Sequence, residues 1–350
     1  MRYATVLAIL ACLPLASCSQ ADKGKPQVTV YMYSEYIDPE LPKEFEKQTG
    51  IAVRIDVYEN TEEMTAKLQH AGGVSQYDVV VVSDHQIPVL AKLGLLQPLD
   101  AAKLPNAKNV ADQFRNPPYD REGKFSLPYQ WGTMGLIYRK DKVQATEFSW
   151  ALVLDPEKQP GPFVLIDSMR DMMAVALKIF GASVNSREPN DLKLASELIL
   201  KAKHSAKCLG FESGVGGKNK VADASAALAI AYSGDAIKAV EADGHLAYVV
   251  PKEGSIIWVD AMTIPAKAPN AEAAHKFINF ILDAQVGAKL SDFNRYATPN
   301  AASLALIKKA DRDNPAIYPS PDTLKTLEYL EDLGEATKLY DEVWTAIKSR

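Results

Sequence analysis

Cysteine is scarce in this chain of 350 residues, which has three, and only Cys208 lies beyond the first 18 positions. One thiol in the body excludes an internal disulfide there, and no Cys-x-x-Cys pair is present for metal or redox chemistry. Basic charge is also in deficit, because 39 Lys and Arg stand against 44 Asp and Glu. No basic surface therefore favours a nucleic acid as a partner. Apolar runs all fall short of the ~20 residues that a membrane-spanning helix needs.

The signatures of common enzymes are missing as well. Neither Gly-x-Ser-x-Gly nor His-Glu-x-x-His occurs in the sequence. The glycine-rich residues 214–218 do not form a phosphate-binding loop, because Glu212 stands where the first glycine belongs and Asn219 follows the lysine. We therefore expect no catalysis, no cofactor and no resident metal. A secreted hydrolase stays open as an alternative, which recovery of an unchanged candidate ligand would exclude.

The N-terminus has the pattern of an export signal. Arg2 precedes a short apolar run over residues 4–16, and the stretch closes with Leu-Ala-Ser-Cys at residues 15–18. This ending resembles the bacterial lipobox, in which the cysteine carries lipid. We expect a lipoprotein signal peptide over residues 1–17 and a lipidated Cys18 with a tether to residue 27. The body would then lie at the extracytoplasmic face of a bacterial membrane. An ordinary signal peptide with an incidental cysteine is the alternative.

Length and pattern predict two α/β domains. At roughly 100–200 residues per domain, 350 residues suggest about two. Apolar runs alternate with helical periods along the chain, which predicts mainly parallel sheets flanked by helices. We expect one lobe over residues 28–133 plus 260–300 and a second over 134–259 plus 301–350, with a ligand cleft between them. Near the end, residues 255–258 and 261–264 look like two strands, and 323–333 looks helical.

Aromatic and acidic side chains recur just after the predicted strands, where ligands of open α/β sheets bind. Aromatic faces attract a cation by roughly 0.5–2 kcal/mol each when it is partly desolvated. Carboxylates accept charge-assisted hydrogen bonds from ammonium groups. Trp258 and Asp260 stand at alternate strand positions and should face the same side. The pattern indicates a small cationic amine as the ligand, although Asp84, Asp167 and Asp235 fit equally well as helix caps.

Several segments in order along the chain resemble bacterial spermidine/putrescine-binding proteins, which serve ABC importers. They are residues 31–36 (Tyr-Met-Tyr-Ser-Glu-Tyr), 45–51 (Phe-Glu-Lys-Gln-Thr-Gly-Ile), 77–80 (Tyr-Asp-Val-Val), 96–100 (Leu-Gln-Pro-Leu-Asp), 127–132 (Leu-Pro-Tyr-Gln-Trp-Gly), 251–254 (Pro-Lys-Glu-Gly), 258–260 (Trp-Val-Asp) and 296–300 (Tyr-Ala-Thr-Pro-Asn). The resemblance implies a two-lobed periplasmic-binding-protein fold of type II, a membrane permease as partner and a monomeric body. It also implies hinge closure, for which residues 132–135 and 260–264 are our candidates.

The same resemblance implies the ligand contacts. Asp260 would be the principal ammonium acceptor, with Trp258 and Tyr36 as flanking walls and Ser34 and Ser83 as smaller polar contacts. The full set is Tyr33, Ser34, Glu35, Tyr36, Ser83, Asp171, Tyr232, Trp258, Asp260 and Tyr296.

The chain departs from the family at three places. Ser168 and Asp171 stand where spermidine binders carry an acidic pair, Leu330 replaces a glutamine, and the first aromatic, Tyr33, replaces a tryptophan. Fewer anions favour a ligand with fewer charges, so putrescine or another small amine is as credible as spermidine. A ferric-ion binder using tyrosines such as Tyr33, Tyr36 and Tyr232, or a binder of an amino-acid-like solute, remains an alternative on the same fold.

Overall fold

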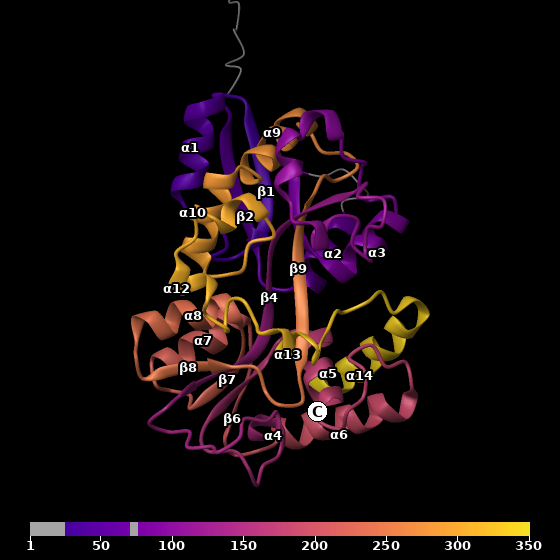
Figure 1. Ribbon diagram of the computed structural model, residues 1–350. Coiled ribbons are helices and arrows are strands. Elements are labelled where there is room, and N and C mark those ends of the chain that lie inside the picture. Colours follow the sequence, from indigo (N-terminus) through magenta and orange to yellow (C-terminus); the bar gives the residue numbers. More distant parts are fainter. Residues whose placement is uncertain (1–24, 71–75) are drawn as a thin grey trace, which may run out of the picture.

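The computed structural model describes residues 25–70 and 76–350, and it has two lobes joined by long central strands (Figure 1). The predicted signal segment 1–17 and Cys18 lie outside the described residues. The mixed α/β class predicted from the sequence is confirmed. The strands are β1 (Gln27–Tyr33), β2 (Ala52–Tyr58), β3 (Val79–Ser83), β4 (Ser126–Arg139), β5 (Phe163–Ile166), β6 (Cys208–Glu212), β7 (Leu228–Tyr232), β8 (Leu246–Val249), β9 (Ser255–Thr263) and β10 (Leu327–Glu328).

Helices cover the strands of both lobes. The α-helices are α1 (Glu40–Thr49), α2 (Thr61–His70), α3 (Ile87–Lys92), α4 (Ala151–Leu154), α5 (Met169–Lys178), α6 (Pro189–Lys203), α7 (Gly214–Ala222), α8 (Ser233–Ala242), α9 (Ala271–Ile281), α10 (Ala284–Asn294), α11 (Ala301–Leu304), α12 (Lys309–Arg312), α13 (Pro321–Leu324) and α14 (Thr337–Ser349). The short 3₁₀ helices are η1 (Asp84–Gln86), η2 (Ala101–Lys103), η3 (Pro105–Asn109), η4 (Asp112–Phe114) and η5 (Gly334–Ala336).

Two antiparallel strands, β4 and β9, connect the lobes. The strand order is β2-β1-β3-β9-β4-β7-β5-β6, with β8 on β4 and β10 on β9. Strand β1 runs parallel to β2 and β3 in the first lobe, and β5 runs parallel to β6 and β7 in the second. The first part of β4 pairs with β9, whereas Met134 to Tyr138 pair with β7. The chain therefore passes from one lobe to the other within a single strand.

The core of the first lobe follows from the four valines that begin β3. Val79 and Val81 pack with residues of α1 and α9, whereas Val80 and Val82 pack with residues of α2 and α3. Successive side chains of a strand point to opposite faces, so a run of valines needs helices on both sides. The sequence carries local stop signals as well. Gly94, just after α3, has φ +69, a left-handed conformation that glycine adopts without strain.

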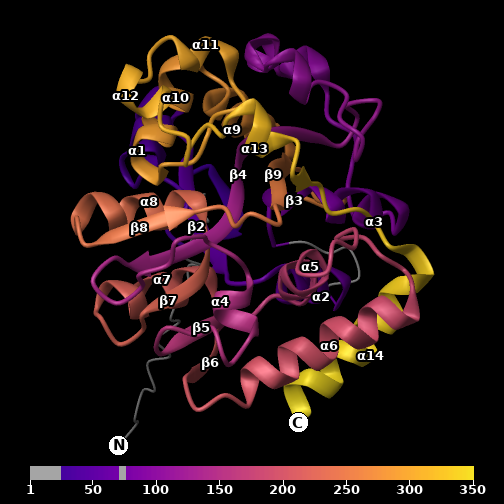
Figure 2. The ribbon, with the colours of Figure 1, turned by 60° about the horizontal axis from the view of Figure 1, so that its bottom comes forward.

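The second lobe is completed by the end of the chain. Helix α14 packs on α5 and α6, and Figure 2 shows α6 and α14 side by side. Helices α7 and α8 cover the opposite face, where Val221 and Ala236 pack on Ile137 and Ala229. Tyr340 and Ile347 of α14 belong to the main buried cluster.

The structure corrects several sequence expectations. Residues 255–264 do not form two strands, because β9 is continuous over Ser255–Thr263. The helix expected over 323–333 is wrong: α13 is a single turn, and Leu327 and Glu328 pair with Ser255 and Ile256 of β9. The glycine-rich segment is the start of α7, and Ser213 Oγ caps it by accepting from Gly216 N. Within residues 25–70 and 76–350, no helix is both long and apolar enough to cross a membrane.

Candidate ligand-binding site

A pocket lies where β1, β3 and β7 end and β9 crosses between the lobes. Its empty space is about 770 Å³, counting the part that is open to solvent. Side chains from both lobes line it. Of the predicted ligand contacts, Tyr33, Ser34, Tyr36, Ser83, Asp171, Tyr232, Trp258, Asp260 and Tyr296 line the pocket, and Glu35 does not.

Asp260 is almost enclosed, with 4% of its surface exposed. Tyr36 Oη donates to its Oδ2 at 2.7 Å and Ser83 Oγ donates to its Oδ1 at 2.8 Å. Burial raises the pKa of Asp260 to about 7; the two hydrogen bonds oppose this rise, and the charges of Asp84 and Asp171 add to it. A nearby cation would favour the ionised carboxylate. At neutral pH the group is therefore poised to ionise when a cation enters.

A chain of hydroxyl groups leads to this carboxylate. Tyr33 Oη lies 3.0 Å from Ser83 Oγ and 2.9 Å from Thr61 Oγ1. Because Ser83 donates its one proton to Asp260, it accepts from Tyr33, and Tyr33 accepts from Thr61. Each hydroxyl thus has its direction set by the ionised Asp260. Such preorganised donors stabilise the negative charge without any rearrangement.

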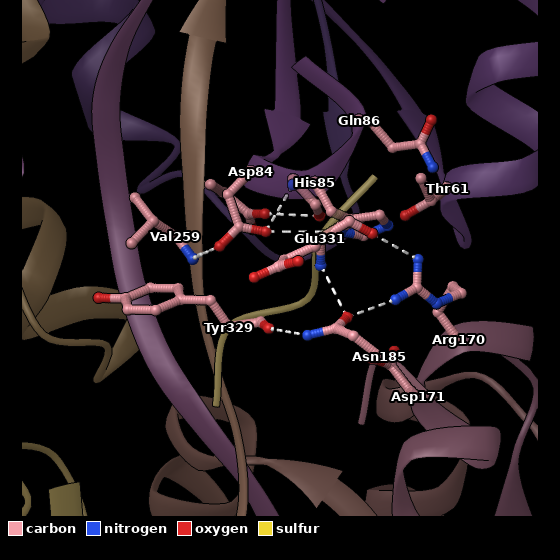
Figure 3. A network of polar contacts seen from close by, with 12 residues as sticks. Thr61, Asp84, His85, Gln86, Arg170, Asp171, Asn185, Val259, Tyr329 and Glu331 are labelled. Atoms are coloured by element: carbon pink, nitrogen blue, oxygen red, sulfur yellow. Dashed lines mark hydrogen bonds and ion pairs between the residues drawn. The ribbon is translucent and has the colours of Figure 1, made fainter. Parts of the chain in front are cut away.

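Buried Asp84 fixes the strand that carries Trp258 and Asp260. Its Oδ2 accepts from Val259 N at 3.1 Å and its Oδ1 accepts from His85 N at 2.7 Å (Figure 3). The bond to Val259 ties β9 to η1 at the residue between the two pocket side chains. Asp84 is not the cap of η1, because Ser83 is the N-cap and makes no side-chain cap bond; the Asp84 carboxylate instead holds the strand in place.

Asp171 forms a second acidic point on the wall from the second lobe. Tyr232 Oη donates to Asp171 Oδ2 at 2.5 Å, joining the first turn of α5 to the end of β7. Burial raises the pKa of Tyr232 well above its ordinary value, and the charge of Asp171 raises it further. The phenol therefore stays protonated and remains a donor to the carboxylate.

Aromatic rings line the space around these acids. Trp258 meets Tyr296 edge-on at 5.0 Å between ring centroids and meets Tyr232 edge-on at 6.0 Å. Tyr36 also stands edge-on to Tyr296, at 5.6 Å. The indole N–H of Trp258 is buried and has no hydrogen-bond partner in the described part of the chain.

Three glycines allow these rings to pack so closely. A Cβ at Gly132 would come within 2.7 Å of the Trp258 ring, and one at Gly234 within 2.5 Å of the Tyr296 ring. A Cβ at Gly214 would come within 2.7 Å of Tyr232. Contacts this short force a shift of the neighbour. Sequence reasoning did not assign these glycines to the site, because the partner rings are distant in the chain.

Glu35 turns away from the pocket and joins the lobes at its edge. Its carboxylate lies 3.2 Å from Lys218 Nζ of α7 and 3.7 Å from Lys238 Nζ of α8. The Lys218 side chain is 9% exposed, against 44% for Glu35. Glu35 has φ +54, a left-handed conformation that is uncommon for a residue with a side chain. Its role as a ligand contact stays a prediction, while the structure gives it another partner.

Other pocket residues escaped the sequence analysis. They are Glu59, Thr61, Glu62, His85, Ser168, Arg170, Gly214, Val215, Ile256 and Leu330, of which Ser168 and Leu330 were noted only as departures from the family. Asp235, which the sequence offered as an acid after a strand or as a helix cap, also lines the pocket. Most lie in first turns of helices, where a polar residue normally indicates a cap or a favourable charge near the helix terminus. No sequence signal separates these uses from ligand contact.

Arg170 fastens the C-terminal segment over one end of the pocket. Its Nη1 donates to Glu331 O and its Nη2 donates to Asn185 Oδ1, each at 2.9 Å (Figure 3). Asn185 also donates to Tyr329 O at 2.8 Å. The residue between these contacts, Leu330, lines the pocket and is almost fully buried. The Arg170 and Asn185 side chains therefore hold the backbone on both sides of Leu330 in place.

Acids outnumber bases in the pocket lining. The carboxyl groups are those of Glu59, Glu62, Asp171, Asp235 and Asp260, and the guanidinium is that of Arg170. Burial raises the pKa of Asp235 to about 6, while the charge of Lys218 and a hydrogen bond from Tyr296 oppose the rise. Among the described residues, no group of three or more His, Cys, Asp and Glu is arranged to hold a metal ion. The arrangement suits an organic cation.

The chain belongs to the family of bacterial extracellular solute-binding proteins, which matches residues 40–319. It is 34% identical to a spermidine/putrescine-binding periplasmic protein of Haemophilus influenzae, covering 92% of this chain and 89% of that protein. It is 35% identical to a putrescine-binding periplasmic protein of Pseudomonas aeruginosa, covering 99% of this chain and 98% of that protein. Both relatives are named as binding proteins.

Solved structures agree with the fold. A structure from Listeria monocytogenes, assigned to spermidine/putrescine ABC transport, superposes with a TM-score of 0.86 at 35% identity. The match covers 92% of this chain and 98% of that one. The two-lobed periplasmic-binding-protein architecture expected from the sequence is thereby confirmed.

Proposed function

We propose that this chain is the substrate-binding component of an ABC importer and that its pocket binds putrescine, spermidine or a similar small cationic amine. The buried Asp260 carries this proposal. It lies among aromatic rings, it receives two hydrogen bonds, and its pKa is about 7. A buried carboxylate is costly unless it is neutralised, so an ammonium group is the natural partner. The names of the relatives support the same ligand class.

Binding would proceed by closure of the two lobes. The hinge is proposed where β4 and β9 pass between them, near Gly132, Gly135 and Asp260. A ligand favours closure when it contacts the closed form better than the open one. Tyr36 and Asp171 reach the pocket from different lobes, so an amine between them gains contacts only after closure.

We further propose that the body works as a monomer tethered through a lipidated Cys18. Leu-Ala-Ser-Cys at residues 15–18 supports the anchor. Such a tether keeps the protein at the extracytoplasmic membrane surface beside a permease. Globomycin, which blocks lipoprotein signal cleavage, would make the uncleaved precursor accumulate, and Cys18→Ser would release the protein from membranes.

Ferric ion is a poorer fit to the same pocket. The phenols of Tyr33, Tyr36 and Tyr232 are engaged with different partners. Burial raises their pKa values, and the charges of Asp260 or Asp171 raise them further. Phenolate ligands would have to form against both effects.

Calorimetric titration tests the proposed function. The soluble body would be titrated with putrescine, spermidine, spermine, agmatine and amino acids, each recovered afterwards to test for chemical change. We expect saturable binding of at least one polyamine, recovered intact, and no saturable binding of neutral or anionic amino acids. Saturable binding of an amino acid, with no binding of any of the four amines, would contradict the proposal.

A further inference from the structure

Glu62 lines the pocket from the first turn of α2. Thr61, just before it, is bonded to Tyr33 at 2.9 Å, and Tyr33 is bonded to Ser83 at 3.0 Å. This is the hydroxyl chain that ends at Asp260, so the start of α2 is fixed to the pocket wall. Glu62 therefore extends from an anchored turn and not from a free loop.

The facing wall comes from the first turn of α5. Ser168 and Asp171 line the pocket there, and the serine stands where the family resemblance implies a carboxylate. This wall thus supplies one negative charge in place of two. Burial is the largest cause that raises the pKa of Glu62; the charge of Asp171 raises it further and the backbone N–H of Met169 opposes the rise. Glu62, Ser168 and Asp171 line the same pocket.

We propose that Glu62 determines specificity: with Asp171 on the facing wall, it holds the second ammonium group of an α,ω-diamine whose first ammonium group is bound by Asp260. This inference rests on the proposed function. Two carboxylates on facing walls repel each other while the pocket is empty and attract a cation placed between them. Because α2 and α5 belong to different lobes, that cation would also favour closure. A monoamine would leave the pair without its cation.

Arg170 is the lining residue that competes for Glu62. Its Nη1 and Nη2 donate to Glu331 O and Asn185 Oδ1, as Figure 3 shows, so the guanidinium is engaged with the C-terminal segment. The carboxyl group of Glu62 is surrounded by the pocket wall, but the residue as a whole is exposed, and solvent screening reduces its interactions. Its contribution should therefore be smaller than that of Asp260.

The test compares Glu62→Gln with Glu63→Gln, which removes the same charge from the same helix outside the pocket lining. Calorimetry with putrescine would measure both variants at low salt. We expect Glu62→Gln to weaken binding about fivefold, in keeping with a partly screened ion pair, and Glu63→Gln to change it less than about twofold. Glu62→Asp, which keeps the charge, should recover part of the loss.

A double-mutant cycle with Asp171→Asn tests whether the two acids share one ammonium group. If they do, the losses from Glu62→Gln and Asp171→Asn will not multiply in the double variant. The inference would be overturned if the affinity losses of the two single variants multiplied in the double variant, or if Glu62→Gln and Glu63→Gln weakened binding equally. Either result would leave the proposed function intact. Failure of the native protein to bind any amine would remove both.

Discussion

The two acidic ends of the pocket are built differently. At one end, both oxygens of Asp260 accept hydrogen bonds, from Tyr36 and Ser83 of the first lobe. At the other end, Asp171 accepts a bond from Tyr232 of its own lobe, and Glu62 lines the pocket from the other lobe. The first end is preorganised before a ligand arrives, whereas the second depends on how the lobes meet. Preorganisation favours affinity, because fewer groups must be ordered on binding.

This difference assigns separate tasks to the two ends. The Asp260 end would bind any ammonium group, and the Asp171 end would discriminate between ligands by their length and charge. Ser168 and Leu330 line the pocket together with Asp171. Variants at Asp260 and at Asp171 should therefore affect binding to different degrees.

The largest effect is expected from Asp260→Asn. We predict that it weakens putrescine binding by about 100-fold, because loss of one member of a buried charge pair typically costs about 2–5 kcal/mol. Asp171→Asn should cost about tenfold. Calorimetry gives both affinities, and circular dichroism verifies that each variant is folded. Equal losses at the two positions would remove the distinction between the ends.

Affinity should fall in acid because the Asp260 end must ionise to bind. With a pKa of about 7, Asp260 is mostly protonated at pH 6. We therefore expect putrescine affinity to fall about tenfold between pH 8 and pH 6. The fall should be much shallower in Asp260→Asn, measured in its own titration series. A native affinity that is constant over this range would show that Asp260 does not bear the charge.

As pH rises, putrescine affinity should increase, whereas the free energy of unfolding of the ligand-free protein should decrease. The pKa of Asp260 is about 7 in the folded protein and about 3.9 when unfolded, so between these values the folded state holds the extra proton. The free energy of unfolding therefore decreases as pH rises from about 4 to 7. Asp235, whose pKa is raised to about 6, acts in the same direction over a narrower range. Thermal unfolding measured over this pH range should show that stability depends less on pH in Asp260→Asn than in the native protein.

A smaller effect is expected where the aromatic wall packs on backbone. Gly132→Ala would force the Trp258 ring and Ser233 Oγ to move, since each lies 2.7 Å from the new Cβ. We expect a loss of about 1–3 kcal/mol in the free energy of unfolding and severalfold weaker binding. Gly244→Ala is the control, because its Cβ meets nothing within 4 Å. If Gly132→Ala and Gly244→Ala gave the same unfolding curve, the close packing of Trp258 on Gly132 would be refuted.

The smallest effect should come from Glu35→Gln at the pocket edge. Its ion pairs with Lys218 and Lys238 join the lobes, but Glu35 is 44% exposed, so screening limits their strength. We expect ligand release to become about twofold faster in stopped-flow measurements, with the difference vanishing near 1 M salt. A large loss of equilibrium affinity would instead support the predicted ligand contact of Glu35.

Much of the first lobe was predictable because its signals are local. Four consecutive valines begin β3, Gly94 follows α3 with positive φ, and Asn60 Oδ1 accepts from Glu63 N at 2.8 Å at the start of α2. Trp258 and Asp260 were placed in the same pocket from strand alternation together with the family resemblance.

The rest depends on contacts that are distant in the chain. Strand β10 lies within residues 323–333, which were expected to be helical, yet its residues pair with β9 in the sheet. Glu35 looked like a ligand contact, yet it pairs with Lys218, 183 residues away. Glu62 was overlooked because an acid in the first turn of a helix already has a local explanation.

A crystal structure of the protein with putrescine would test the central claim most directly. The account predicts closed lobes, one ammonium nitrogen within hydrogen-bonding distance of Asp260, and methylene groups lying against Trp258 and Tyr36. The second nitrogen should lie on the side of Asp171 and Glu62. Putrescine bound away from Asp260, with this carboxyl group still facing only Tyr36 and Ser83, would contradict the account.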